Sequence, residues 1–193
     1  MKKIGLTGGI GSGKSFVGKI LESMGYPVYY SDQRAKKIMN TNSIIREGLT
    51  NIFGSEAFIN DRIDRDFLAH QIFNKPVLRT KINDLVHPIV RDDFNKWSKS
   101  HNAHQFLFNE AAILFETGAN KNFDAVILVC APEQLKIERV LERDAIKEDD
   151  VKLKMNAQWT DDRKIKLTPY HIVNDGIQSI PPQIENILLA IGS

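Results

Sequence analysis

Eight consecutive residues near the start of the chain constrain its fold more than any other feature. Residues 8–15 read Gly-Gly-Ile-Gly-Ser-Gly-Lys-Ser, which is the spacing G-x-x-x-x-G-K-[ST]. Apolar residues before the motif predict a strand over residues 3–7, and apolar residues after it recur at helical spacing: Phe16, Val17, Ile20, Leu21 and Met24. A glycine-rich loop that joins a strand to a helix is typical of a phosphate-binding loop. The alternative is a turn that binds nothing, which the conformational cost of its glycines disfavours.

Each residue type in this loop suits a bound phosphate. The glycines let the backbone turn tightly and point successive N–H groups inward. The Lys14 ammonium can reach the outer phosphates of a nucleotide, and the Ser15 hydroxyl can bind Mg²⁺. A helix that begins near Lys14 adds the positive end of its dipole. The loop residues predicted to bind nucleotide are Gly8, Gly9, Gly11, Ser12, Gly13, Lys14, Ser15 and Phe16.

Composition argues against several classes of protein. The formal net charge is only +2, so we expect no duplex nucleic acid as a partner. Cys130 is the only cysteine, which excludes an internal disulfide and fits a reducing compartment, and its apolar neighbours favour a buried strand over a reactive thiol. No apolar run approaches the roughly 20 residues of a membrane span, and no signal-peptide pattern opens the chain. We therefore expect a soluble, cytoplasmic protein.

Strand-like apolar runs alternate with helical patterns along most of the chain. The clearest of the later helices are expected after the fourth strand and at the end of the chain, the last one preceded by two prolines. Such alternation predicts an α/β fold with a five-stranded parallel sheet covered by helices on both faces. The expected strands cover residues 3–7, 28–30, 105–109, 125–130 and 171–174, and the later helices cover 134–143 and 183–190.

Residues 41–102 interrupt this alternation, because they contain no convincing strand. We therefore assign residues 1–40 and 103–193 to a nucleotide-binding core and 41–102 to an inserted helical domain that can hold a second substrate. The alternative is an insertion that only elaborates the packing. Helical spacing predicts helices over residues 44–53, 66–73 and 75–99, the last with a bend at Pro88.

Residues 144–166 also stand apart, because they are rich in charge and poor in apolar side chains. We expect this segment to form a lid that closes over the nucleotide. A solvated pair of surface helices is the alternative.

Phosphoryl transfer needs positioning and charge neutralisation, and three side chains are candidates for these roles. Asp32 follows the second expected strand at the sheet edge where ligands bind, and its carboxylate can accept the proton of an attacking hydroxyl. The alternative is a helix N-cap, for which Ser31 is a rival. Arg139 and Arg143 share a helix face with Lys136, and an Arg side chain can bind two phosphate oxygens. An ordinary salt-bridged surface is the alternative.

Further residues are candidates for binding substrate, metal or nucleotide, but a purely structural role would explain each of them as well. Glu110 and Glu116 follow the third expected strand and can contact either a metal through water or the second substrate, but surface or capping roles fit as well. His87 can contact substrate, although a lone histidine is more often structural. Asn174 and Gly176 close the last strand and can line an adenine ring with backbone groups, or they can form only a turn.

Several motifs share one order and spacing along the chain. Residues 6–15 read Leu-Thr-Gly-Gly-Ile-Gly-Ser-Gly-Lys-Ser, and the motifs that follow are Asp32 with Ala35, Leu85-Val86-His87-Pro88, Leu114-Phe115-Glu116, Arg139 with Arg143-Asp144, Gln158, and the residues from Ile172 to Gly176. Together they resemble the dephospho-coenzyme A kinase family over nearly the whole chain. The resemblance implies a P-loop, nucleoside-monophosphate-kinase-like fold of three α/β/α layers with a helical substrate domain and a lid.

The same resemblance implies an activity and its cofactors. It implies ATP-dependent phosphorylation, with Mg²⁺, of the ribose 3′-hydroxyl of dephospho-CoA to give CoA and ADP, the final step of coenzyme A biosynthesis. By resemblance Asp32 is the catalytic base, and Lys14, Arg139 and Arg143 act on the transferred group. A monomer suffices, because all expected groups come from one chain. The residues expected to contact the acceptor are Thr7, Asp32, His87 and Glu116, and those expected to contact nucleotide beyond the loop are Asn174 and Gly176.

Two other functions stay open beside this one. A P-loop kinase of another nucleoside, nucleotide or small-metabolite hydroxyl is one alternative, although the large insertion favours a large acceptor. A nucleotide-sensing switch is the other, and the sequence lacks the Asn-Lys-x-Asp motif that reads guanine. The chain also departs from the family pattern at a few positions. It has Phe16 where the family usually has Thr, Tyr30 in place of Asp, Ala112 in place of Pro, and Thr168-Pro169 in place of Ala-Asp.

Overall fold

The structure, a computed structural model, describes residues 1–73 and 75–193. The chain forms two compact units, one made of Met1–Tyr30 with His101–Ser193 and the other of Ser31–Ser100. Each unit has its own cluster of buried apolar side chains. None of the helices within the described ranges has the length and apolar content that crossing a bilayer requires.

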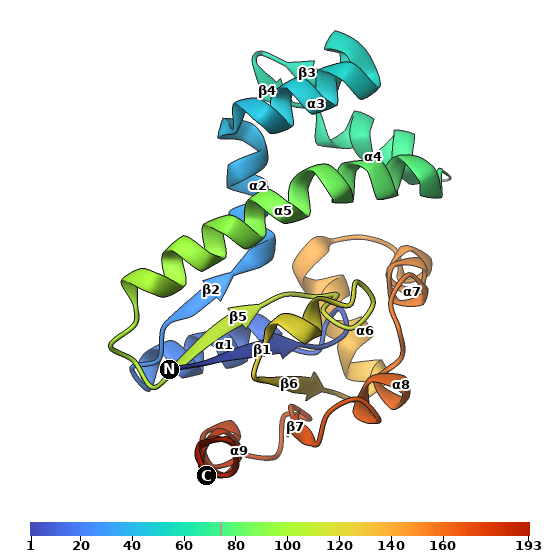
Figure 1. The fold of residues 1–193 in the computed structure, drawn as a ribbon. Helices are drawn as coiled ribbons and strands as arrows, with labels where there is room; N and C mark the ends of the chain where they lie inside the picture. Colours follow the sequence, from blue (N-terminus) through green and yellow to red (C-terminus); the bar gives the residue numbers. More distant parts are fainter. Residues whose placement is uncertain (74) are drawn as a thin grey trace. The chain divides into compact units, whose positions relative to one another are not determined.

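A five-stranded parallel sheet forms the centre of the first unit (Figure 1). The strand order is β2-β5-β1-β6-β7, so the strand that leads into the glycine-rich loop is central. The five strands that the apolar runs predicted are all present, and the α/β fold class is confirmed. They are β1 (Lys2–Thr7), β2 (Val28–Tyr30), β5 (Phe106–Glu110), β6 (Ala125–Cys130) and β7 (Tyr170–Val173).

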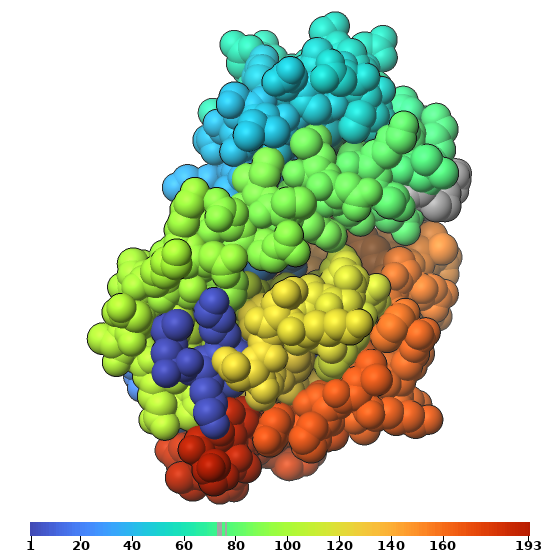
Figure 2. Space-filling model, viewed as in Figure 1, coloured from blue at the N-terminus to red at the C-terminus, as the bar shows by residue number. Residues whose placement is uncertain are grey.

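Both faces of this sheet are covered, which is why its strands are continuously apolar. On one face Ile4 and Leu6 pack with side chains of α1 (Lys14–Ser23) and α9 (Ile180–Gly192). On the other face a Cβ atom added to Gly5 would touch Leu114 and Phe123, because side chains of the segment after β5 lie directly over this glycine. Figure 2 shows the red C-terminal helix beside the blue N-terminal residues, where the Lys2 ammonium donates to the Ile191 carbonyl.

Three more helices belong to the first unit. They are α6 (Glu133–Asp144), α7 (Glu148–Asn156) and α8 (Asp161–Ile165), and a short 3₁₀ turn, η2 (Ala119–Asn122), precedes β6. The segment predicted to be a lid therefore contains α7 and α8. Val151 of α7 is fully buried against Ile137 and Val140 of α6. Helix α7 therefore packs on α6 through buried apolar side chains, although the sequence of this segment is rich in charge.

The second unit is mainly helical. Its elements are α2 (Ser31–Thr41), α3 (Ser43–Phe53), η1 (Gly54–Ala57), β3 (Phe58–Ile59), β4 (Arg62–Ile63), α4 (Arg65–Phe73) and α5 (Pro76–Ser100). Buried Ile45, Leu49 and Leu68 meet Ile82 and Val86 of α5, which gives these helices a common core. Pro88 lies inside α5, and the helix continues past it.

The prediction that residues 41–102 contain no strand is wrong, because β3 and β4 pair as a short antiparallel hairpin. The two residues between them, Asn60 and Asp61, have φ angles of 48° and 62°. A two-residue hairpin turn needs positive φ at both positions, and Asn and Asp tolerate this conformation better than other residues with side chains. The adjacent Asn60 and Asp61 are therefore the sequence feature from which this hairpin could have been predicted.

The second unit begins at Ser31 rather than at the predicted residue 41. The physical reason lies in α2, where Ile38 and Met39 pack against the core of the second unit. The Asn40 side-chain oxygen also accepts a hydrogen bond from the Ile63 N–H at 3.4 Å. Helix α2 thus packs with the inserted helices although it directly follows a strand of the sheet.

Candidate active site

The glycine-rich loop leaves β1 after Thr7 and enters α1 at Lys14. Gly11 and Gly13 have φ angles of 77° and 88°, a region that disfavours residues with a Cβ. A Cβ at Gly11 would also collide with the Lys136 carbonyl, and one at Gly13 with the Asn174 amide nitrogen. Both positions therefore require glycine, because of backbone conformation and because neighbouring groups lie so close.

The loop presents hydrogen-bond donors in the pattern that a phosphate needs. The N–H groups of Gly11, Gly13 and Ser15 have no acceptor among the residues that the structure describes. They lie at the N-terminus of α1, where the helix dipole favours an anion. The Lys14 ammonium donates to the Gly9 carbonyl at 3.3 Å and is almost fully buried. This donor set fits a polyphosphate.

The same loop fits Mg²⁺ through one side chain. Ser15 is exposed at the start of α1, so its hydroxyl is accessible to a ligand. Mg²⁺ is commonly held by one or two protein oxygens together with phosphate oxygens and waters, so a single hydroxyl beside a phosphate site is sufficient. Within residues 1–73 and 75–193 there is no cluster of three or more His, Cys, Asp or Glu side chains that could hold a metal.

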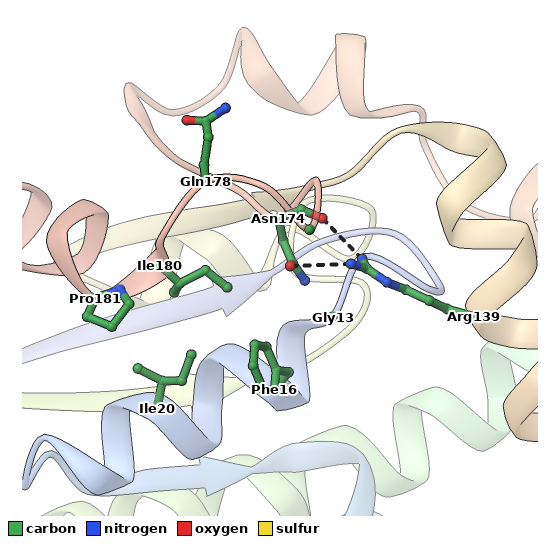
Figure 3. A pocket seen from close by; sticks show the side chains of 9 residues that line it. Gly13, Phe16, Ile20, Arg139, Asn174, Gln178, Ile180 and Pro181 are labelled. Carbon is green, nitrogen blue, oxygen red and sulfur yellow. Dashed lines mark hydrogen bonds between the residues drawn. The ribbon is translucent and has the colours of Figure 1, made fainter.

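Asn174 and Arg139 brace the loop from the side of α6 and β7 (Figure 3). The Asn174 amide donates to the Ser12 carbonyl at 2.9 Å, and its side-chain oxygen accepts from the Arg139 guanidinium at 3.4 Å. Arg139 also donates to the Asn174 backbone carbonyl at 3.2 Å and to the Gly11 carbonyl at 3.4 Å. The Asn174 side chain, 6% exposed, is therefore engaged inside the protein.

A cavity of about 480 Å³ opens beside this network. Figure 3 shows apolar side chains of α1 and α9 along one wall and Arg139 with Asn174 along another. Phe16 is 57% exposed there, so its ring can stack on a planar ligand. The cavity adjoins the donors of the phosphate loop, as a base-binding cavity must. Its lining residues are Gly13, Phe16, Ile20, Arg139, Asn174, Gly176, Gln178, Ile180 and Pro181.

Comparison with known proteins identifies the family. Residues 2–179 match the family model described as dephospho-CoA kinase. The chain belongs to the dephospho-CoA kinase family. A Bacteroides fragilis dephospho-CoA kinase is 36% identical over 186 residues, covering 96% of this chain and 91% of that protein. A Porphyromonas gingivalis dephospho-CoA kinase is 38% identical over 189 residues, covering 97% of this chain and 93% of that protein.

Solved structures share the fold of this chain. A Thermus thermophilus crystal structure, 31% identical, superposes with a TM-score of 0.84 and covers 98% of this chain and 95% of its own. A shikimate kinase from Acinetobacter baumannii shares the fold at a TM-score of 0.55 and 14% identity, covering 100% of this chain and 94% of its own. The dephospho-CoA kinase family resemblance and the P-loop kinase fold expected from the motifs are thus confirmed.

Other predicted site residues of this dephospho-CoA kinase family member are already engaged. The Arg143 guanidinium is exposed and bonded to its neighbour Asp144 at 2.7 Å, which raises its pKa, and it is not among the residues that line the cavity. Thr7 is fully buried and donates to the Ala112 carbonyl at 3.3 Å. Glu110 is buried in β5. Of the two predicted arginines, the structure brings only Arg139 to the phosphate loop.

Glu116 was expected to contact the acceptor, but its carboxylate pairs with protein groups. Its Oε1 lies 2.8 Å from the Lys164 ammonium and accepts the Trp159 N–H at 3.0 Å. Lys164 is fully buried, although the charge-rich sequence around it suggested a surface. No local sequence signal marks this ion pair, because its members lie far apart in the chain.

Two predicted residues of this dephospho-CoA kinase family member lie in the second unit. Asp32 is exposed in the first turn of α2, which directly follows β2. His87 lies on an exposed position of α5. Partial desolvation lowers the pKa of His87, and the charge of Arg91 acts in the same direction while Asp84 opposes it. These surroundings therefore favour the neutral form of the imidazole.

Proposed function

We propose that this protein is a dephospho-CoA kinase that transfers the γ-phosphoryl group of ATP to the ribose 3′-hydroxyl of dephospho-CoA, giving CoA and ADP. One observation carries the proposal: in a chain of this family, unengaged loop amides at a helix N-terminus adjoin a cavity of about 480 Å³. Phosphoryl transfer requires little more from a protein than such positioning together with charge neutralisation.

On the donor side, the base of ATP would occupy the cavity beside Phe16, and its phosphates would lie along the loop. Gly11 and Gly13 would donate backbone hydrogen bonds to the phosphates, and Lys14 would neutralise their outer charge. Arg139 would add positive charge beside the loop. Ser15 would bind Mg²⁺, which when bound offsets charge that develops on the transferred group. Gly176 would contact the nucleotide from the cavity wall.

On the acceptor side, Asp32 would accept the proton of the attacking hydroxyl and orient it for attack. Its exposure supports this role, and so does its place after β2, because ligands of parallel α/β sheets bind beyond the carboxyl ends of the strands. The helices of residues 31–100, including His87, would hold the acceptor. We also infer that a monomer suffices, since every proposed group comes from one chain.

The decisive experiment incubates purified protein with Mg²⁺, ATP and one acceptor at a time. Mass detection of the acceptor with one added phosphoryl group, for dephospho-CoA and not for shikimate, gluconate or nucleoside monophosphates, is the expected result. Phosphorylation of another acceptor in preference would replace this function with a different P-loop kinase activity. Binding of ATP without phosphorylation of any acceptor would instead indicate a nucleotide-sensing switch.

A further inference from the structure

The peptide unit between Gly9 and Ile10 is bound at both of its polar ends. Its N–H, on Ile10, donates to the Gln158 side-chain oxygen at 2.8 Å. Its carbonyl, on Gly9, accepts from the Lys14 ammonium at 3.3 Å and from the Ser12 N–H at 3.1 Å. A trans peptide is planar, with its N–H and carbonyl pointing in opposite directions. The direction of the Gly9 carbonyl is therefore set by whatever binds the Ile10 N–H.

Gln158 is itself part of a polar wall around Gly9. A Cβ atom added to Gly9 would lie 3.5 Å from the Asp161 carboxylate, 3.8 Å from the Gln158 side-chain oxygen and 3.8 Å from the Lys136 ammonium. Lys136 and Asp161 form an ion pair of 2.7 Å whose side chains are only 9% and 16% exposed. This pair attaches the start of α8 to α6 directly beside the loop.

A second ion pair fixes the residue next to Gln158. The Trp159 N–H is bound by Glu116, which also pairs with the fully buried Lys164 of α8. The Gln158 N–H in turn donates to the Met155 carbonyl at the end of α7. The backbone at Gln158 is therefore bound on both sides, which fixes the point from which its side chain reaches the loop.

We propose that Gln158 is a positioning residue for the donor triphosphate, acting through the Gly9–Ile10 peptide on Lys14. By binding the Ile10 N–H, Gln158 keeps the Gly9 carbonyl turned toward the Lys14 ammonium. Lys14 is thereby held where it can meet the outer phosphates. The Glu116–Lys164 and Lys136–Asp161 pairs place Gln158 for this task, so Glu116 supports the donor site through them. The inference rests on the proposed function only in assuming that ATP binds this loop.

The test is a double-mutant cycle on nucleotide binding, measured by calorimetry with Mg²⁺. Gln158→Met keeps the size of the side chain but removes the acceptor, and leaving the Ile10 N–H unpaired is expected to weaken ATP binding about tenfold. Adenosine has no phosphates, so its affinity should not change. In a Lys14→Met background, Gln158→Met should weaken ATP binding by less than about twofold more, because the effect passes through Lys14.

Gln134→Met is the matched control, since Gln134 is exposed on α6 and bonds only to Glu138 among the described residues. If Gln158→Met folds poorly, Gln158→Asn, too short to reach Ile10, replaces it with the same expectation. Unchanged ATP binding in these variants, equal weakening of adenosine binding, or full additivity with Lys14→Met would each overturn the inference alone. Absence of ATP binding by the unmodified protein would overturn both the inference and the proposed function.

Discussion

At the scale of single residues, polar side chains near the phosphate loop serve the protein backbone more than the sequence suggested. Asn174 lines the cavity, as expected for a residue beside the nucleotide, and its side-chain amide also bonds to Ser12 and Arg139. Glu116 was expected at the acceptor, yet it pairs with Lys164. A loop rich in glycine has little rigidity of its own, so neighbouring side chains must supply it.

Asp32 is the residue whose role is most directly testable. Asp32→Asn removes the proton acceptor without changing size, so kcat should fall by about 10²- to 10⁴-fold while the affinity for ATP stays nearly constant. Asp66→Asn is the matched control, because Asp66 is also exposed in the first turn of a helix of the second unit. Near-normal turnover of Asp32→Asn in a coupled ADP-release assay would exclude Asp32 as the base.

Cys130 yields a prediction about reactivity. Burial raises the pKa of its thiol from an ordinary value of 9.0 to about 11, and the Asp161 carboxylate adds to the shift. At pH 8 the folded protein should react with iodoacetamide roughly 100-fold more slowly than the urea-unfolded chain, as followed by mass spectrometry. Between those two values the unfolded chain has lost a proton that the folded protein retains, so this group makes folding less favourable as the pH rises through that window. Equal alkylation rates for the folded and the unfolded protein would contradict a raised pKa of the Cys130 thiol.

At the scale of elements, the charge-rich segment of residues 144–166 is attached to the core by ion pairs. Lys136 and Glu116, from α6 and from the segment after β5, pair with Asp161 and Lys164 of α8. Buried apolar contacts hold α7 on α6 as well. Any movement of this segment over ATP would therefore have to leave α8 attached, because separating a buried ion pair is costly.

The Glu116–Lys164 pair should dominate the stability of this region. Lys164→Met leaves the Glu116 carboxylate without its cation and should lower the free energy of unfolding by about 3–5 kcal/mol in urea titrations. Lys152→Met is the comparison, because Lys152 forms an exposed pair with Glu148 on α7. We expect no measurable change in that control. A similar stability for both variants would show that burial of Lys164 contributes little.

At the scale of the whole molecule, the division into two units separates the proposed donor and acceptor roles. The phosphate loop and its cavity lie in the first unit, whereas Asp32 and His87 lie in the second. Each unit has its own core, so a ligand can stabilise one without directly contacting the other.

Amide hydrogen exchange can test this separation of roles. Adding ATP with Mg²⁺ should slow exchange in residues 8–17 and 174–178, because bound phosphates and base restrict local opening there. Dephospho-CoA added alone should slow exchange within residues 31–100. Free AMP serves as the control for binding of an adenine nucleotide without the pantetheine arm. Protection by ATP confined to residues 31–100 would reverse the proposed assignment of the units.

The sequence alone determined the phosphate loop and the five strands, because each depends on residues close together in the chain, and it determined the family through the order of several such local motifs. A strand, a turn and the start of a helix each depend on a short stretch of sequence, so the spacing of residue types within that stretch predicts them. The hairpin at Asn60 and Asp61 is also a local feature, and the adjacent Asn and Asp residues are its turn signal. The start of the second unit at Ser31 was not local, since it follows from where the α2 side chains pack.

Tertiary structure alone decided which polar groups meet. Asn174 reaches the carbonyl of Ser12 across 162 positions of sequence, Gln158 reaches Ile10 across 148, and Lys164 finds Glu116 from within a run of charges. Hydrogen bonds and ion pairs form wherever folding brings complementary groups within reach, and no periodicity in the sequence records that pairing. The loop was therefore predictable as a motif, whereas the side chains that keep it in shape emerged only once β7, α6 and α8 had packed around it.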